Sequence, residues 1–122
     1  MRFDPNDMTT LVVKIGTNLL SGQRAFDGQV LEGVVRELCE LKNAHDLNLL
    51  LVSSGAVGCG MTTLGLDQRP TALPDKQAVA AVGQATLMHY YETLFKTYGR
   101  GLSTAQVLLT LADLDNRQTQ LN

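Results

Sequence analysis

The sequence predicts a single α/β domain built on a mostly parallel sheet, and it predicts that this sheet is incomplete. Two short apolar runs, residues 11–15 and 47–53, are separated by a segment with helical periodicity. Both runs carry apolar residues on both faces, which is typical of strands buried in a parallel sheet. A third apolar run, residues 102–109, is followed by the start of another helix. We therefore expect the chain to be a piece of a larger α/β domain whose next strand is missing.

Length and composition set the class of protein. A chain of 122 residues suffices for one small domain, and 44% hydrophobic with 18% charged residues argues against disorder. The formal net charge of −2 gives no basic field for nucleic acid or an anionic membrane. No apolar run approaches the roughly 18 residues of a spanning helix. Cys39 and Cys59 do not form a CxxC pair, so a reduced, cytoplasmic protein is expected.

The first helix is expected from residue 28 to about residue 43. Its apolar residues recur with a period of 3.6, and Asp27 is placed to cap its first turn; they are Val30, Leu31, Val34, Val35, Leu38 and Leu41. Strand, helix and the strand at residues 47–53 together predict a right-handed parallel βαβ unit.

Two further helices are expected. Residues 53–58 turn the chain into a helix that ends near Gly65, and a long helix spans residues 75–98, with Pro74 near its start and Gly99 past its end. The expected apolar stripe of the long helix comprises Val79, Val82, Leu87, Tyr91, Leu94, Phe95 and Tyr98. Residues 102–109 are predicted as a third strand, and residues 110–113 as the opening of another helix.

Lys14 is the first candidate functional residue. It ends the first strand and is followed by Gly16 and Thr17, at the sheet edge where open α/β sheets bind ligands. A lysine can neutralise phosphate oxygens, and a glycine lets backbone N–H groups approach them. The alternative is an ordinary surface lysine beside a turn, because short patterns of this kind have many false positives.

The second candidate is the glycine-rich turn after residues 47–53. A helix that begins there would offer free N–H groups and a positive dipole end to a carboxylate or phosphate, and Ser54 adds a hydroxyl. Gly58 and Gly60 lower helix propensity, which indicates either close approach of a ligand or tight packing. The order of the glycines matches neither GxGxxG nor GxxxxGK[ST].

The remaining candidates favour structural roles. Gly83 within the long helix is expected to permit helix packing, with a ligand contact as the alternative. His45 and His89 have no ligand-spaced partner, so no metal site is predicted. Ser54 lacks a triad, and Cys59 lacks an activating neighbour, which argues against a hydrolase.

Taken together, four segments resemble the amino acid kinase family in order and spacing. They are residues 12–18, 52–57, 76–84 and 105–110, and the resemblance covers residues 9–122. It implies a three-layer α-β-α sandwich with a mostly parallel sheet. It further implies transfer of the γ-phosphoryl of ATP, accompanied by Mg²⁺, to the γ-carboxylate of L-glutamate, giving L-glutamyl 5-phosphate on the way to proline. The chain would be the N-terminal portion of the kinase domain, with no second domain present.

The resemblance assigns roles to six residues. By matching position, Lys14 would be catalytic and would bind the ATP phosphates together with Gly16 and Thr17. Glutamate would be bound by Ser54, Gly55 and Ala56. The family's later Asn-Asp segment, its second active-site lysine and its nucleotide-binding loops have no counterpart here, so we expect this chain alone to be inactive.

Alternatives stay open at this point. Within the family, the rivals are members that resemble aspartokinase or acetylglutamate kinase. From another class, the rival is a non-catalytic module that binds a carboxylate or mediates oligomerisation. The expected partners are L-glutamate and ATP, with proline as a feedback inhibitor and a homo-oligomeric state, and with neither nucleic acid nor membrane.

Overall fold

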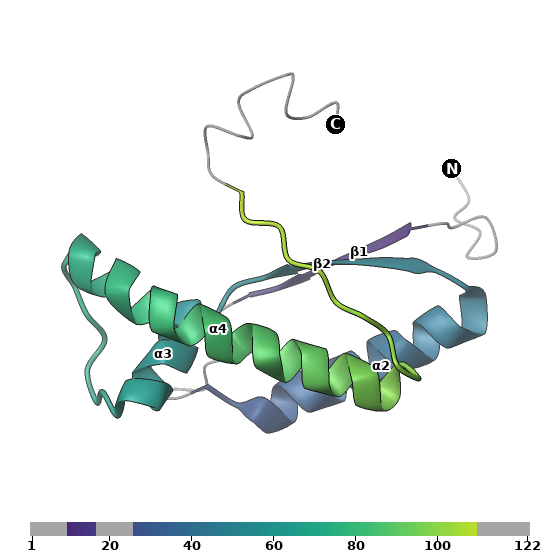
Figure 1. Cartoon of the computed structure of the whole chain (residues 1–122), viewed down its shortest axis with the longest axis horizontal. Helices are drawn as coiled ribbons and strands as arrows, with labels where there is room; N and C mark the ends of the chain where they lie inside the picture. The colour runs from purple at the N-terminus through teal and green to yellow at the C-terminus, as the bar shows by residue number, and fades with distance from the viewer. Residues whose placement is uncertain (1–9, 17–25, 110–122) are drawn as a thin grey trace, which may run out of the picture.

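The computed structural model describes residues 10–16 and 26–109, and within them it confirms the α/β class. The elements are β1 (Thr10–Ile15), α2 (Gly28–His45), β2 (Asn48–Ser53), α3 (Ala56–Leu64) and α4 (Leu73–Tyr98). The two strands pair in parallel, with Thr10 opposite Asn48 at one end and Ile15 opposite Ser53 at the other. The predicted βαβ unit is therefore confirmed, with α2 as its crossover helix (Figure 1).

Helix α2 begins where its cap was predicted and ends two residues later than expected. The Asp27 carboxylate accepts hydrogen bonds from the backbone N–H groups of Gln29 and Val30, at 3.0 and 3.2 Å. This satisfies donors that the first turn leaves without a partner. At the other end Asp46 adopts a left-handed conformation with φ of 50°, which stops the helix and turns the chain into β2.

Helices α3 and α4 pack so closely that their backbones touch. A Cβ atom added at Gly83 would lie 1.8 Å from the carbonyl oxygen of Ala56, and one added at Gly60 would lie 2.0 Å from that of Val79. Only glycine fits at these two positions, because any side chain would collide with backbone of the facing helix. The packing alternative is therefore confirmed for Gly60 and Gly83.

The buried stripe of α4 differs from the prediction at one position. Its fully buried members recur every four residues: Val79, Gly83, Leu87, Tyr91 and Phe95. Gly83, rather than the predicted Val82, occupies the second position, and Val82 is 38% exposed. A hydrophobic pattern alone could not find this, because glycine contributes to the contact by lacking a side chain.

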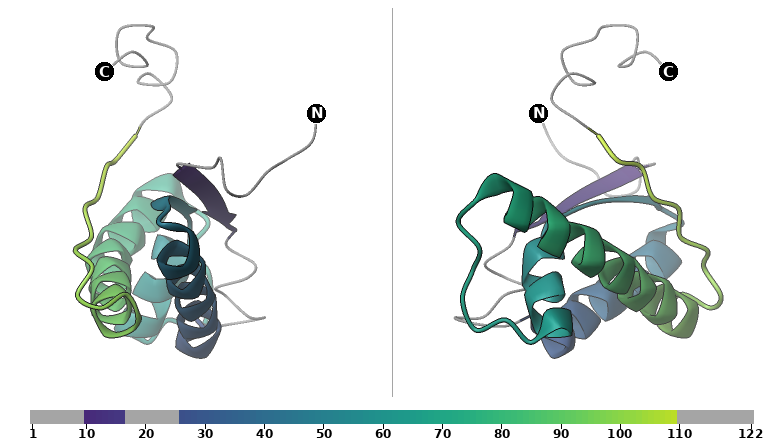
Figure 2. Two further views of the ribbon diagram at one scale, coloured as in Figure 1. Left: turned by 90° about the vertical axis from the view of Figure 1, so that its right-hand side faces the viewer. Right: turned by 60° about the vertical axis from the view of Figure 1, so that its left-hand side comes forward.

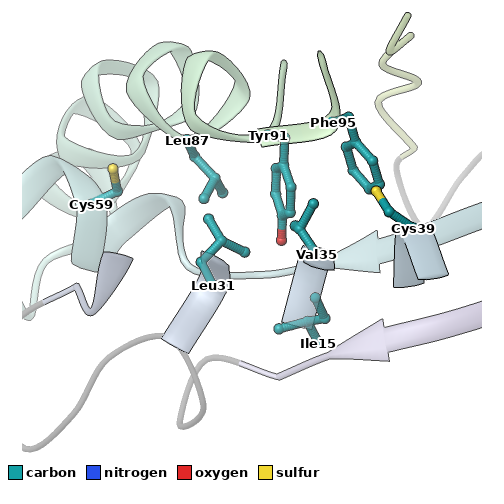
Figure 3. Packing of buried hydrophobic residues seen from close by; sticks show 8 residues of the cluster. All are labelled: Ile15, Leu31, Val35, Cys39, Cys59, Leu87, Tyr91 and Phe95. Atoms are coloured by element: carbon teal, nitrogen blue, oxygen red, sulfur yellow. The ribbon is translucent and has the colours of Figure 1, made fainter. Parts of the chain in front are cut away.

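All three helices lie on the same face of the sheet (Figures 1 and 2). The core between them and the sheet is shown in Figure 3 and comprises Ile15, Leu31, Val35, Cys39, Cys59, Leu87, Tyr91 and Phe95. The opposite face is open: Val12, Leu50 and Val52 are 59%, 55% and 50% exposed. The prediction of strands buried on both faces is thus wrong for the described residues, which supply one helical layer and the sheet.

The third predicted strand is not formed. Residues 102–109 are irregular, and Val107, Leu108 and Leu109 at their end are exposed. A strand exists only through its ladder of hydrogen bonds, and an apolar run by itself does not say whether a partner edge accepts it. The helix expected from residue 110 lies outside the described residues.

Candidate functional site at the carboxyl ends of the strands

The end of β1 presents Lys14 on the open face of the sheet. Along β1, Ile15 points into the core while Lys14 and Val12 are exposed on the other side, as their alternation predicts. In the parallel register Lys14 lies opposite Val52, which is half exposed. Lys14 therefore lies on the sheet face that the described helices do not cover, and its predicted placement at a strand end is confirmed.

Gly16 is the first residue after β1 and lies in open surroundings. A Cβ atom added there would meet no atom within 4 Å among the described residues. Packing within the described chain therefore does not require glycine at this position. Thr17, the third residue expected to contact phosphate, lies outside the described residues.

The end of β2 is tied to the end of β1 through one carbonyl group. The backbone N–H and the hydroxyl of Ser54 both donate to the carbonyl oxygen of Ile15, each at 3.1 Å. The structure thereby brings the two predicted candidates, Lys14–Gly16 and Ser54–Gly55, to one edge of the sheet. Because its proton is engaged, the Ser54 hydroxyl offers lone pairs to an incoming ammonium group, and it must turn away from Ile15 to donate to a carboxylate.

Gly55 turns the chain from β2 into α3. Its φ of 121° lies in a region that side chains strongly disfavour, so glycine is required by conformation here. No side chain among the described residues caps α3, and its first regular hydrogen bond runs from Cys59 N–H to the carbonyl oxygen of Gly55. The N–H groups of the preceding residues, which include the predicted site residue Ala56, are the positive end of the helix and suit an anion.

A contact that the sequence analysis missed lies directly behind this turn. The Ser53 hydroxyl lies 2.5 Å from the hydroxyl of Tyr91, which reaches from α4 toward the sheet (Figure 3). Burial raises the pKa of the Tyr91 phenol, and the hydrogen bond with Ser53 opposes that effect. A signal existed: Ser53 occupies an inward position of β2, and Tyr91 lies on the apolar stripe of α4.

The structure also places Cys59 and Lys76, the first residue of the third family-like segment. Cys59 is buried, and burial raises the pKa of its thiol, so it is protonated rather than nucleophilic. Lys76 is exposed in the first turn of α4. In the part of the chain that the structure describes, no group of three His, Cys, Asp or Glu residues is placed to hold a metal, and no helix is both long and apolar enough to cross a membrane.

The fold and the two strand ends can now be compared with known proteins. The sequence profile of the amino acid kinase family matches residues 9–122, and the chain belongs to this family.

Within the family, the chain is similar to proteins named glutamate 5-kinase. It is 50% identical over 113 residues to the one from Moorella thermoacetica, a match that covers 92% of this chain and 29% of the relative. The corresponding protein of Synechococcus elongatus is 47% identical over 115 residues (93% and 30%), and that of Thermus thermophilus is 44% identical over 112 residues (92% and 30%). The chain thus spans about 30% of the length of these relatives.

Proposed function

We propose that this chain is the N-terminal portion of a glutamate 5-kinase, which transfers the γ-phosphoryl of ATP to the γ-carboxylate of L-glutamate. One observation carries the proposal: the Ile15 carbonyl joins a strand end bearing Lys14 to the uncapped turn at Ser54 and Gly55. A phosphoryl donor and a carboxylate acceptor must meet at a short distance, and this edge offers an anion-binding group for each. The 50% identity to a glutamate 5-kinase supports the choice of substrate.

Lys14 is assigned the transferring phosphoryl group. In the reaction a γ-carboxylate oxygen attacks the γ-phosphorus, the bond to ADP breaks, and negative charge spreads over the migrating group. A lysine ammonium at a strand end can stabilise that charge. Gly16 and Thr17 would add contacts to the phosphates. Mg²⁺ would arrive with ATP, since the described residues at the two strand ends include no carboxylate to hold it.

Ser54, Gly55 and Ala56 are assigned L-glutamate. Glutamate carries two carboxylates and an ammonium group, and the turn offers N–H donors for the former and the Ser54 lone pairs for the latter. We further propose that the whole enzyme acts in the cytoplasm on the route to proline, is inhibited by proline, and is homo-oligomeric.

The second candidate is a non-catalytic module that binds a carboxylate at this turn. The uncapped start of α3 favours it, because that feature can bind an anion with or without a nucleotide. The two candidates differ in their dependence on ATP and on Lys14.

A chimera tests the proposal. Residues 9–122 of this chain replace the matching segment of the Moorella thermoacetica relative, and γ-glutamyl hydroxamate formation is measured with ATP and L-glutamate. We expect an active chimera that loses about a hundredfold or more in kcat/KM on Lys14→Ala, the size of effect seen when a preorganised charge-stabilising group is removed.

The matched control is Lys96→Ala, which removes an exposed lysine whose only described ion pair is with Glu92 on the same helix. It should leave the rate unchanged. If the chimera prefers aspartate or acetylglutamate, the proposed substrate L-glutamate is wrong. A folded chimera that binds glutamate without any turnover would favour the binding module.

A further inference from the structure

Tyr91 contacts the candidate loop through a chain of two hydroxyl groups, its own and that of Ser53. The Ser53 hydroxyl donates to the carbonyl oxygen of Ser54 at 3.1 Å and lies 2.5 Å from the Tyr91 hydroxyl. A serine hydroxyl has one proton to give. Either hydroxyl can donate in the contact between Ser53 and Tyr91. When the Ser53 proton goes to the Ser54 carbonyl oxygen, the neutral Tyr91 hydroxyl donates to Ser53.

The end of this chain is the peptide group that joins Ser54 to Gly55. In a trans peptide the carbonyl and the N–H point in opposite directions within one plane. Holding the Ser54 carbonyl toward the Ser53 hydroxyl therefore aims the Gly55 N–H away from that hydroxyl. Gly55 is the residue at which the chain turns, with φ of 121°. Because glycine has no side chain, steric contacts at this residue do not fix the orientation of the Ser54–Gly55 peptide plane.

We propose that Tyr91 is a positioning residue for substrate binding: it orients the Ser54–Gly55 peptide through Ser53, so that the Gly55 N–H is held ready for a carboxylate of L-glutamate. This inference rests on the proposed function for the identity of the ligand. Tyr91 suits the task because it is 4% exposed and is packed against Phe95 and the rest of the core, with ring centroids 6.3 Å apart. Its hydroxyl therefore has a fixed position, whereas Ser54 itself is held separately by the Ile15 carbonyl.

The test uses Tyr91→Phe and Ser53→Ala, which break the hydroxyl chain while leaving the ring and the strand in place. The matched control is Tyr98→Phe. Tyr98 lies two turns after Tyr91 on α4, and its phenol hydroxyl donates to Glu32 of α2. Circular dichroism and the thermal midpoint establish that each variant is folded.

The first readout needs no ligand. In a ¹⁵N-labelled sample of this chain, the Gly55 amide signal should shift, and its exchange with solvent should quicken, in Tyr91→Phe and in Ser53→Ala. Tyr98→Phe should leave it unchanged. An unmoved Gly55 signal in a folded Tyr91→Phe variant would overturn the inference, whatever the ligand is.

The second readout is kinetic and uses the chimera. Tyr91→Phe should raise KM for L-glutamate about five- to tenfold with kcat nearly unchanged, the pattern expected when ground-state and transition-state binding are weakened equally. The double variant Tyr91→Phe/Ser53→Ala should be no worse than either single one, because all three break the same chain. A fall in kcat with KM unchanged would contradict the positioning role. So would a double variant whose loss equals the sum of the two single losses. An inactive parent chimera counts against the proposed function instead, and the Gly55 signal then decides the inference by itself.

Discussion

Three buried side chains with ionisable groups shape the response of this chain to pH. Burial raises the pKa of the thiols of Cys39 and Cys59 above their ordinary 9.0, and it raises that of the Tyr91 phenol above 10.0. Each group is therefore easier to ionise in the unfolded chain than in the folded one. Folding therefore favours the neutral forms of all three groups.

The sign of the pH dependence follows from these shifts. Well below pH 9.0 all three groups are neutral in both states, and their full contribution to stability is present. As pH rises through 9.0 the unfolded thiols lose protons first, so the free energy of unfolding falls until the folded groups also titrate. Urea unfolding at neutral pH and above pH 9.0 should show this loss. The double variant Cys39→Ala/Cys59→Ala should lose less over the same interval, and an equal loss would contradict the assignment.

Residues at the strand ends show how far sequence reasoning reaches. The face of Lys14 and the cap at Asp27 were predictable, because both depend on neighbours in the chain. The bond of Ser54 to Ile15 and that of Ser53 to Tyr91 join residues 39 and 38 positions apart. Nothing local encodes such contacts. The positions of these serines could be inferred, but their partners could not.

Among the described helices, α3 and α4 form the tightest contact. Their approach at Gly60 and Gly83 places backbone against backbone, whereas α2 keeps side chains between itself and its neighbours. Sequence reasoning anticipated packing at Gly83 but placed Val82 on the stripe. A pattern of hydrophobic side chains cannot indicate this contact, because glycine makes it by having no side chain.

The same substitution should therefore have opposite effects in two helices. Gly83→Ala puts a methyl group 1.8 Å from the Ala56 carbonyl oxygen, so α3 and α4 must separate, and we expect a loss of about 3 kcal/mol. Gly33→Ala lies within α2, where an added Cβ meets no atom within 4 Å among the described residues. It should stabilise the chain by about 0.5–1 kcal/mol through helix propensity. Urea unfolding of both variants measures the two signs, and a neutral Gly83→Ala would refute the close contact.

At the scale of the whole molecule, the dominant feature is a sheet that the described residues cover on one face only. Val12, Leu50 and Val52 form an apolar surface on the open side, and the two-stranded sheet leaves strand edges unpaired within the described residues. Exposed apolar faces and open edges promote association. The sequence predicted the parallel strands and an incomplete sheet. It could not say which face would be open, because the apolar residues on the two faces are alike.

We accordingly expect this chain to self-associate as its concentration rises. Leu50→Lys, a charge placed in the middle of the open face, should shift sedimentation profiles toward the monomer. Leu41→Lys is the matched control, since Leu41 is a comparably exposed leucine on the outer surface of α2. Equal effects of the two variants would show that association does not use the sheet face. A wild-type chain that stays a monodisperse monomer at high concentration would contradict the expected self-association itself.

The carbonyl of Ile15 has one more consequence, which concerns cooperativity. It belongs to the strand that presents Lys14, yet it holds the serine assigned to the other substrate. Under the proposed function, a nucleotide that fixes the end of β1 also fixes the partner of Ser54, and part of the ordering needed by the second ligand is then already done. Linkage makes this coupling free energy reciprocal: glutamate must tighten the binding of nucleotide by the same factor by which nucleotide tightens the binding of glutamate.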